Sequence, residues 1–202
     1  MSLTQTFTIK SANGMKYIGD MKDGMRHGKG TLLWPNGIVY EGTFADGEAT
    51  GQGKLTYPTG QVCEGHFEGG VMEGKGSVKW DEAEYVGDIV SGMAEGIGRI
   101  IWKDGRIFEG NWRNSMMHGK GSITWPDGRK FEGQFNDDVK QGYGTYIWAN
   151  GSKYVGEWSH NKQHGFGEFT SVEGIKRSGE WFEGKRVRWM DEEPLDACLA
   201  AN

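Results

Sequence analysis

One five-residue phrase recurs along the whole chain: an aromatic residue, any residue, a glycine, any residue and a bulky apolar residue. Copies of this phrase begin at Tyr17, Tyr40, Cys63, Tyr85, Phe108, Phe131 and Tyr154, and a degenerate eighth copy begins at Arg177. Successive copies start 23 residues apart, except for one step of 22 between Cys63 and Tyr85. A fixed period of this length predicts an array of structural repeats.

The same period places the glycines. Counting the first residue of each copy as position zero, glycine occupies position two in all eight copies and positions eleven and thirteen in the seven full copies. Positions seven and twenty hold most of the others, so that of 35 glycines only Gly69 falls outside these phases. A flexible linker has no use for glycine at a set register, and the composition therefore predicts an ordered fold.

Within each repeat, apolar and polar residues alternate at positions zero to four and again at positions thirteen to seventeen. Period two is typical of a strand with one apolar face, so each repeat is predicted to form two strands. The stretch between positions five and ten is expected to form one turn. Sequences such as Trp34-Pro-Asn-Gly37 form the other, as a type I turn closed by a left-handed residue.

The predicted fold is all-β: an elongated, single-layer antiparallel meander of tandem 23-residue β-hairpin repeats, about sixteen strands in all. Aromatic rings are expected to cover the glycines of neighbouring strands. The array takes up residues 1–190, as a half repeat over 7–16, seven full repeats over 17–176 and the degenerate eighth over 177–190.

Residues 191–202 form an acidic tail. Pro194 follows two acids and precedes Leu195, Cys198 and Leu199, which predicts a short helix over 193–201. That helix either caps the last strand of the sheet in the same chain or docks on another molecule. The other irregularity, Asp81-Glu82-Ala83-Glu84, is one residue short and predicts either a bend in the ribbon or a tighter hairpin.

The phrase that opens each repeat, the Gly-x-Gly in mid-repeat and the Asp/Asn-Gly turn resemble the MORN repeat (membrane occupation and recognition nexus), in tandem from about Phe7 to Met190. The resemblance implies a scaffold, since similar proteins serve in cilia and flagella, parasite cytoskeletons, membrane junctions and sperm structures. It also implies a cytoplasmic location on the cytoskeleton, in a ciliary or flagellar axoneme.

A single-layer sheet has no second layer to cover its aromatic face, and large exposed apolar surfaces usually mark partner sites. We therefore expect a groove that binds an amphipathic helix or an extended peptide of a protein partner, with self-association as a further option. The expected anchors of this groove are Phe44, Phe67, Trp80, Trp102, Trp112, Trp125, Phe135, Trp148 and Trp158.

The alternative function is binding of anionic phospholipid, as a peripheral membrane or membrane-tethering module. A basic cluster near the end of the array suits lipid headgroups. Its members are Lys176, Arg177, Lys185, Arg186 and Arg188. The acidic tail that follows can neutralise this cluster within the same molecule, so a protein partner is favoured.

Other function classes find little support in the sequence. A net charge of −5 disfavours nucleic acid, no apolar run reaches the length of a membrane span, and no signal-peptide core precedes the array. Its two cysteines, Cys63 and Cys198, are too few for a disulfide framework. His27, His118 and His164 each precede position eleven but lie in different repeats, which predicts exposed turn residues and not a metal cluster. No enzymatic activity and no cofactor are expected.

Overall fold

The computed structural model describes residues 6–191, and the tail helix expected over 193–201 lies outside this range. The chain divides into two compact units, residues 1–104 and 105–202. In the described part of both units the regular structure consists of strands, with no helix, and this confirms the all-β prediction.

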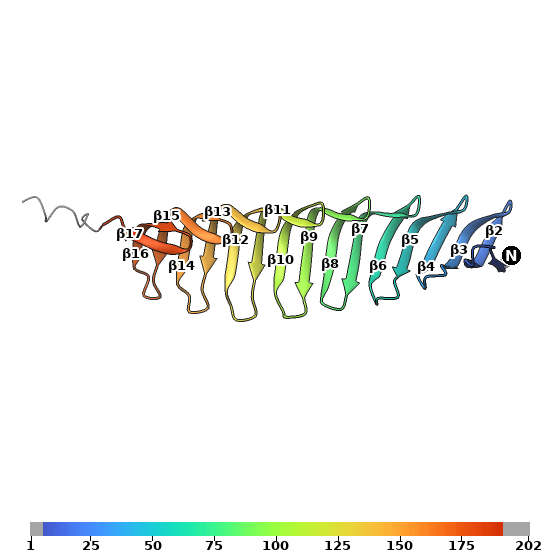
Figure 1. The fold of residues 1–202 in the computed structure, drawn as a ribbon, viewed down its shortest axis with the longest axis horizontal. Coiled ribbons are helices and arrows are strands. Elements are labelled where there is room, and N and C mark those ends of the chain that lie inside the picture. The colour runs from blue at the N-terminus through green and yellow to red at the C-terminus, as the bar shows by residue number, and fades with distance from the viewer. Residues whose placement is uncertain (1–5, 192–202) are drawn as a thin grey trace, which may run out of the picture. The chain divides into compact units, whose positions relative to one another are not determined.

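The first unit contains nine strands, each paired antiparallel with the next along the chain (Figure 1). They are β1 (Phe7–Lys10), β2 (Lys16–Lys22), β3 (Met25–Leu33), β4 (Val39–Ala45), β5 (Glu48–Thr56), β6 (Val62–Glu68), β7 (Val71–Trp80), β8 (Ala83–Val90) and β9 (Met93–Trp102).

The second unit contains eight strands with the same antiparallel order. They are β10 (Ile107–Arg113), β11 (Met116–Thr124), β12 (Lys130–Asn136), β13 (Val139–Ile147), β14 (Lys153–Ser159), β15 (Lys162–Thr170), β16 (Lys176–Phe182) and β17 (Lys185–Trp189). Each unit is thus a meander of hairpins, as predicted. The described residues contain seventeen strands in total, close to the predicted number of about sixteen.

Two glycines face each other in each of the seven full repeats, and in six of these one ring lies over both. In the fourth repeat Gly87 of β8 pairs with Gly98 of β9, and a Cβ placed on Gly98 would lie 2.5 Å from Cε2 of Tyr85. A Cβ on Gly87 would lie 2.5 Å from the Cα of Gly98. The Tyr85 hydroxyl donates a hydrogen bond of 2.7 Å to the Asp88 carbonyl, which fixes the ring in this position. The expected covering of glycines by aromatic rings is therefore present.

The third repeat departs from this pattern because Cys63 replaces the ring. Met72 fills the space: its Sδ atom would lie 3.2 Å from a Cβ on either Gly65 or Gly76, and its side chain is buried. A flexible thioether suits an irregular gap of this kind. The glycine pair is therefore less tightly enclosed here than in the fourth repeat.

The turn expected between positions five and ten is shorter than predicted. Only positions six and seven lie outside the strands, as in Asp46-Gly47 with φ values of 49° and 87°. Two residues with positive φ form a type I′ turn, whose twist matches that of the strands and lets pairing resume at position eight. Position nine therefore lies in a strand, directly opposite position four.

The turns also join each repeat to the preceding one. The N–H of Gly47 donates to the Arg26 carbonyl (3.0 Å), and the N–H of Gly184 donates to the Gln163 carbonyl (2.9 Å). At the tips between strands of neighbouring repeats, Gly37 has φ 86° and its N–H bonds to the Trp34 carbonyl (2.9 Å), as the predicted type I turn requires. The shortened link at residues 81–84 is a tighter hairpin, with Trp80 paired to Ala83.

Alanine substitutions at two glycines of the first unit test the ring cover. Gly98→Ala should lower the free energy of unfolding by about 1–3 kcal/mol or more, because Tyr85 has to leave its place. Gly76→Ala should cost clearly less, because the nearest side-chain atoms belong to Ile89 and the flexible Met72, at 3.0 and 3.2 Å. Urea unfolding of both variants measures the difference. Equal losses would show that the ring is not what excludes a side chain here.

Candidate binding surface

The strand register places one set of positions on a common face of each sheet. Position zero pairs with position fifteen, as Tyr40 with Leu55, and position four pairs with position nine, as Phe44 with Ala49. Directly paired residues of antiparallel strands project to the same side. We call this side the aromatic face: positions zero, four, nine and fifteen of the repeats, with the rings at position seventeen beside them.

Five of the nine expected groove anchors are buried within the protein's own core. They are the position-four rings Phe44, Phe67, Trp112, Phe135 and Trp158, with exposed fractions between 2% and 8%. Each packs edge-on against position-zero rings, as Tyr40 against Phe67 with centroids 5.0 Å apart and Phe131 against Trp158 at 5.0 Å. These rings form the floor of the aromatic face and hold the repeats together.

The other four anchors are the position-seventeen tryptophans, and they remain accessible. Trp80 is 37% exposed, and Trp102, Trp125 and Trp148 are half-buried. Trp148 lies between Tyr146 and Phe169, with centroid distances of 4.9 and 5.8 Å. Of the nine expected anchors, these four tryptophans are therefore the ones that solvent can reach.

Two hollows open on the aromatic face of the first unit. One, of about 320 Å³, lies over the second repeat around Ala49 and Tyr57, and the other, of about 340 Å³, lies over the first repeat around Ile9 and Tyr17. Both are lined mainly by apolar side chains, and Arg26, Leu32 and Gly47 line both.

The second unit carries a lysine among aromatic rings on the same face. The Nζ atom of Lys140 lies 4.9 Å from the centroids of Trp125 and Phe131 and 5.3 Å from those of Tyr146 and Trp158. Burial among these rings, with a smaller contribution from Arg129, lowers the pKa of Lys140 to about 8. The rings themselves attract the ammonium through their negative faces.

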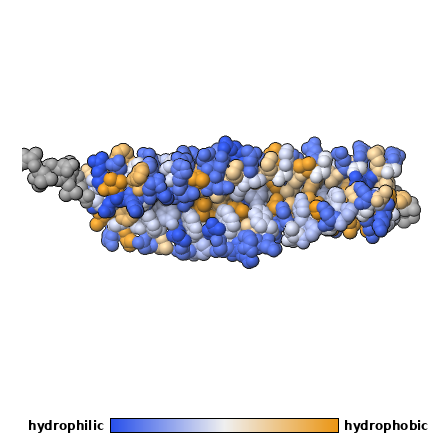
Figure 2. Space-filling model, viewed as in Figure 1, coloured by the Kyte–Doolittle hydropathy of each residue, from blue (hydrophilic) through white to orange (hydrophobic). Residues whose placement is uncertain are grey.

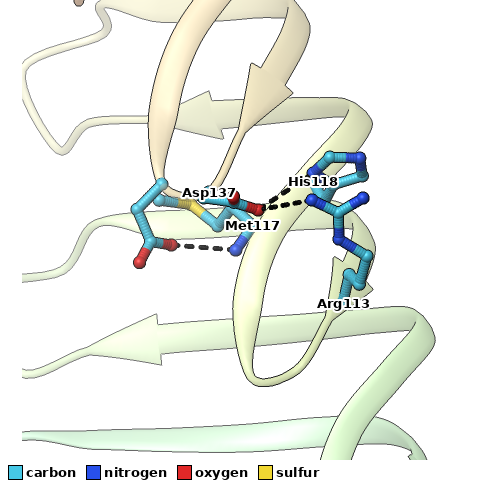
Figure 3. A network of polar contacts seen from close by, with 5 residues as sticks. Arg113, Met117, His118 and Asp137 are labelled. Atoms are coloured by element: carbon cyan, nitrogen blue, oxygen red, sulfur yellow. Dashed lines mark hydrogen bonds and ion pairs between the residues drawn. The ribbon is translucent and has the colours of Figure 1, made fainter.

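The histidines at position ten lie within strands and not on exposed turns: His27 in β3, His118 in β11 and His164 in β15. His118 is half-buried, and its Nδ1 atom lies 3.2 Å from Oδ1 of Asp137 in the next repeat, which also accepts a hydrogen bond of 3.0 Å from Arg113 (Figure 3). The nearby amide of Met117 donates to Asp138 at 2.8 Å. The Nδ1 atom of His164 is buried without a hydrogen-bond partner. No group of three metal-binding side chains occurs in residues 6–191.

Much of the basic cluster near the end of the array is paired with the chain's own acids. Lys176 lies 3.0 Å from Glu168, and Arg188 lies 2.8 Å from Glu180. Arg177 forms a two-pronged pair with Asp191, at 2.8 and 3.2 Å.

Arg186 instead lies 4.3 Å from the centroid of the buried Trp189 ring. Lys185, the remaining member of the cluster, forms no ion pair with any of residues 6–191. Residues 6–191 contain no helix that is long and apolar enough to span a membrane.

The sequence profile of the MORN repeat matches seven segments: residues 17–39, 40–62, 63–81, 85–105, 108–128, 131–153 and 154–176. These segments cover more than half of the chain, which therefore belongs to the MORN-repeat family. Among curated protein sequences, no match was found.

Solved structures similar to this chain include two protein domains. The TCP domain of SAS-4 from Drosophila melanogaster, solved in complex with a proline-rich motif of Ana2, is 12% identical over 87% of this chain and 90% of that domain, with a TM-score of 0.49. The TCP10 domain of CPAP from Danio rerio is 14% identical over 91% of this chain and 98% of that domain, with a TM-score of 0.43. A likeness of this degree says nothing about what the present protein binds.

An Asp137→Asn substitution tests the contact between repeats five and six. Hydrogen bonding from Arg113 holds the pKa of Asp137 below its ordinary value of 3.8. A carboxylate with a depressed pKa stabilises the fold above its unfolded-state pKa, and the effect is lost as the pH falls through the folded-state value. We expect a lower melting temperature for the variant at pH 7, and a difference from the wild type that shrinks as the pH falls below about 4.

Thermal unfolding followed by circular dichroism between neutral and acidic pH measures this difference. Asp127→Asn is the matched control, because Asp127 contacts only the neighbouring Arg129, within its own turn, at 2.6 Å. A difference for Asp137→Asn that stays constant down to acidic pH would contradict the assigned role of its charge.

Proposed function

We propose that this protein is a non-enzymatic scaffold or adaptor whose aromatic face binds a helix or an extended segment of partner proteins. The observation that carries the proposal is the pair of apolar hollows in the first unit, beside rings that no second layer covers within the described residues. Concave, mainly apolar sites with a few polar groups are typical ligand sites.

The buried rings and the accessible rings have different roles in this proposal. Phe44, Phe67, Trp112, Phe135 and Trp158 support the surface from below, because they are already enclosed by the protein itself. Trp80, Trp102, Trp125 and Trp148 supply the contact area, and partly exposed tryptophans are frequent anchors of protein interfaces. Self-association through the same face is a variant of this proposal.

The proposed setting is the cytoskeleton, in a ciliary or flagellar axoneme or a similar assembly. This part rests on the resemblance to family members with such roles.

Binding of anionic phospholipid remains the second candidate, with Lys176, Arg177, Lys185, Arg186 and Arg188 as its patch. The ion pairs of Lys176, Arg177 and Arg188 with the chain's own acids disfavour it.

Photo-cross-linking inside the native cell tests the surface directly. A photoreactive phenylalanine analogue placed at position 80 or 148 should capture the same protein partner. The same analogue at position 143 is the control, because Tyr143 is 57% exposed and belongs to the opposite face of its sheet. Specific capture from position 143 alone would show that the partner binds the opposite face of the sheet, and this would contradict the proposal.

A further inference from the structure

The positions that define the aromatic face carry positive charge but no acid. Across the described repeats, positions zero, four, nine, fifteen and seventeen contain no aspartate or glutamate. Basic residues occur there at position nine of repeats one, six and eight, as Arg26, Lys140 and Arg186, and at position zero of the last, as Arg177. In a chain with a net charge of −5, this separation of charge between faces points to the chemistry of what binds.

Arg26 is half-buried at the wall shared by the two hollows of the first unit. Its guanidinium carbon lies 5.7 Å from the centroid of Phe44, and it forms no ion pair with any of residues 6–191. Glu48, which also lines one hollow, is exposed at the start of β5. A planar guanidinium in an apolar setting is suited to a two-pronged contact with a carboxylate.

Lys140 occupies the corresponding position in the sixth repeat. Four rings surround its ammonium group, Arg129 is nearby, and no carboxylate of the described chain pairs with it. Rings compensate only part of the hydration that a half-buried cation loses. An incoming carboxylate would supply the missing countercharge.

Arg186 repeats the arrangement at the last strand. It lies over Trp189, whereas Arg188, two residues further on and on the opposite face, pairs with Glu180. Three repeats thus present a cation beside an aromatic ring, each at position nine on the aromatic face of its own unit, with no acid of the described chain as an ion-pair partner.

We propose that the aromatic face of each unit binds an acidic, amphipathic segment. In the first unit its carboxylates pair with Arg26 and its apolar side chains enter the two hollows, and in the second unit its carboxylates pair with Lys140 and Arg186. This inference rests on the proposed function and specifies its partner class. Opposite charges across an interface fix its register and reject wrong partners.

An acidic protein segment fits these cations better than a membrane does. A lipid surface is attracted by a dense basic cluster, whereas these three residues lie in separate repeats of an acidic protein. Arg26 is also recessed between two hollows, where a side chain from a narrow segment can reach it. Recognition of the acidic segment is therefore expected to depend on short-range ion pairs and not on long-range electrostatic attraction.

Synthetic peptides and the full chain test the proposal. The probe is a helix-forming peptide with leucine at the apolar heptad positions and glutamate at the others, and its twins carry glutamine or lysine in place of glutamate. We expect the glutamate peptide to bind best in fluorescence anisotropy, with affinity falling as salt rises. Arg26→Gln, Lys140→Gln and Arg186→Gln should each weaken binding, and the triple variant should weaken it by about tenfold or more.

Lys130→Gln and Arg188→Gln are the matched controls, because both cations pair with acids on the opposite face, Glu132 and Glu180, and should leave binding unchanged. Circular dichroism confirms that each variant is folded. Equal binding of the glutamate and glutamine peptides, both lost when Trp80 and Trp148 are replaced by alanine, would overturn the acidic partner while leaving the proposed function intact.

Two other results would also overturn the proposal. The first is that the glutamate peptide does not bind, whatever the cross-linking experiment finds. The second is that the protein floats with phosphatidylserine vesicles but does not bind the peptide, and that flotation depends on Arg26, Lys140 and Arg186. That result would assign the three cations to lipid binding.

Discussion

The close approach of two backbones in each repeat is the constraint on which the rest of the structure depends. Where Gly87 meets Gly98, any side chain on either residue would collide with the other strand or with Tyr85. The absence of side chains at the two glycines leaves a space in which the ring lies flat. The ring in turn makes the apolar contacts that glycine cannot make. A sheet of one layer gains its core in this way, from rings laid along its own surface.

This arrangement accounts for the division of roles along a repeat. Position-zero and position-four rings meet edge-on within and between repeats, as Phe108 meets Trp112 at 5.3 Å and Phe135 at 5.2 Å. Such contacts add to the apolar burial and are made mainly between neighbours, so stability follows the nearest-neighbour logic of repeat proteins. The turn hydrogen bonds from position seven to position nine of the preceding repeat reinforce the same junctions.

The sequence predicted the fold more fully than it predicted the surface. Period-two alternation, the repeat length and the phased glycines are local signals, and they were enough for the strands, their antiparallel order and the covering rings. The length of the turn was missed, because Asn114-Ser115 and Asp137-Asp138 adopt positive φ without a glycine and so give no clear type I′ signal. Position nine was consequently assigned to a turn, and the cations there were not recognised as part of the aromatic face.

Burial explains why the predicted groove anchors separate into two sets. In the sequence, an aromatic residue that fills the protein's own core cannot be told apart from one that stays exposed. Only the packing of neighbouring repeats distinguishes Phe135, which is 3% exposed, from Trp80, which is 37% exposed. On the face seen in Figure 2, hydrophobic patches are separated by hydrophilic side chains.

Because the core and the aromatic face lie on the same side of the sheet, a partner cannot be recognised by apolar contact without touching residues that also stabilise the fold. Specificity for a partner is therefore best encoded at positions whose side chains contribute least to the packing of the aromatic rings. Position nine is such a place: alanine, methionine, glutamine, lysine and arginine all occur there, opposite a conserved bulky position four within this one chain. Variation at position nine changes the hollows and charges of the surface while the ring packing beneath it stays the same.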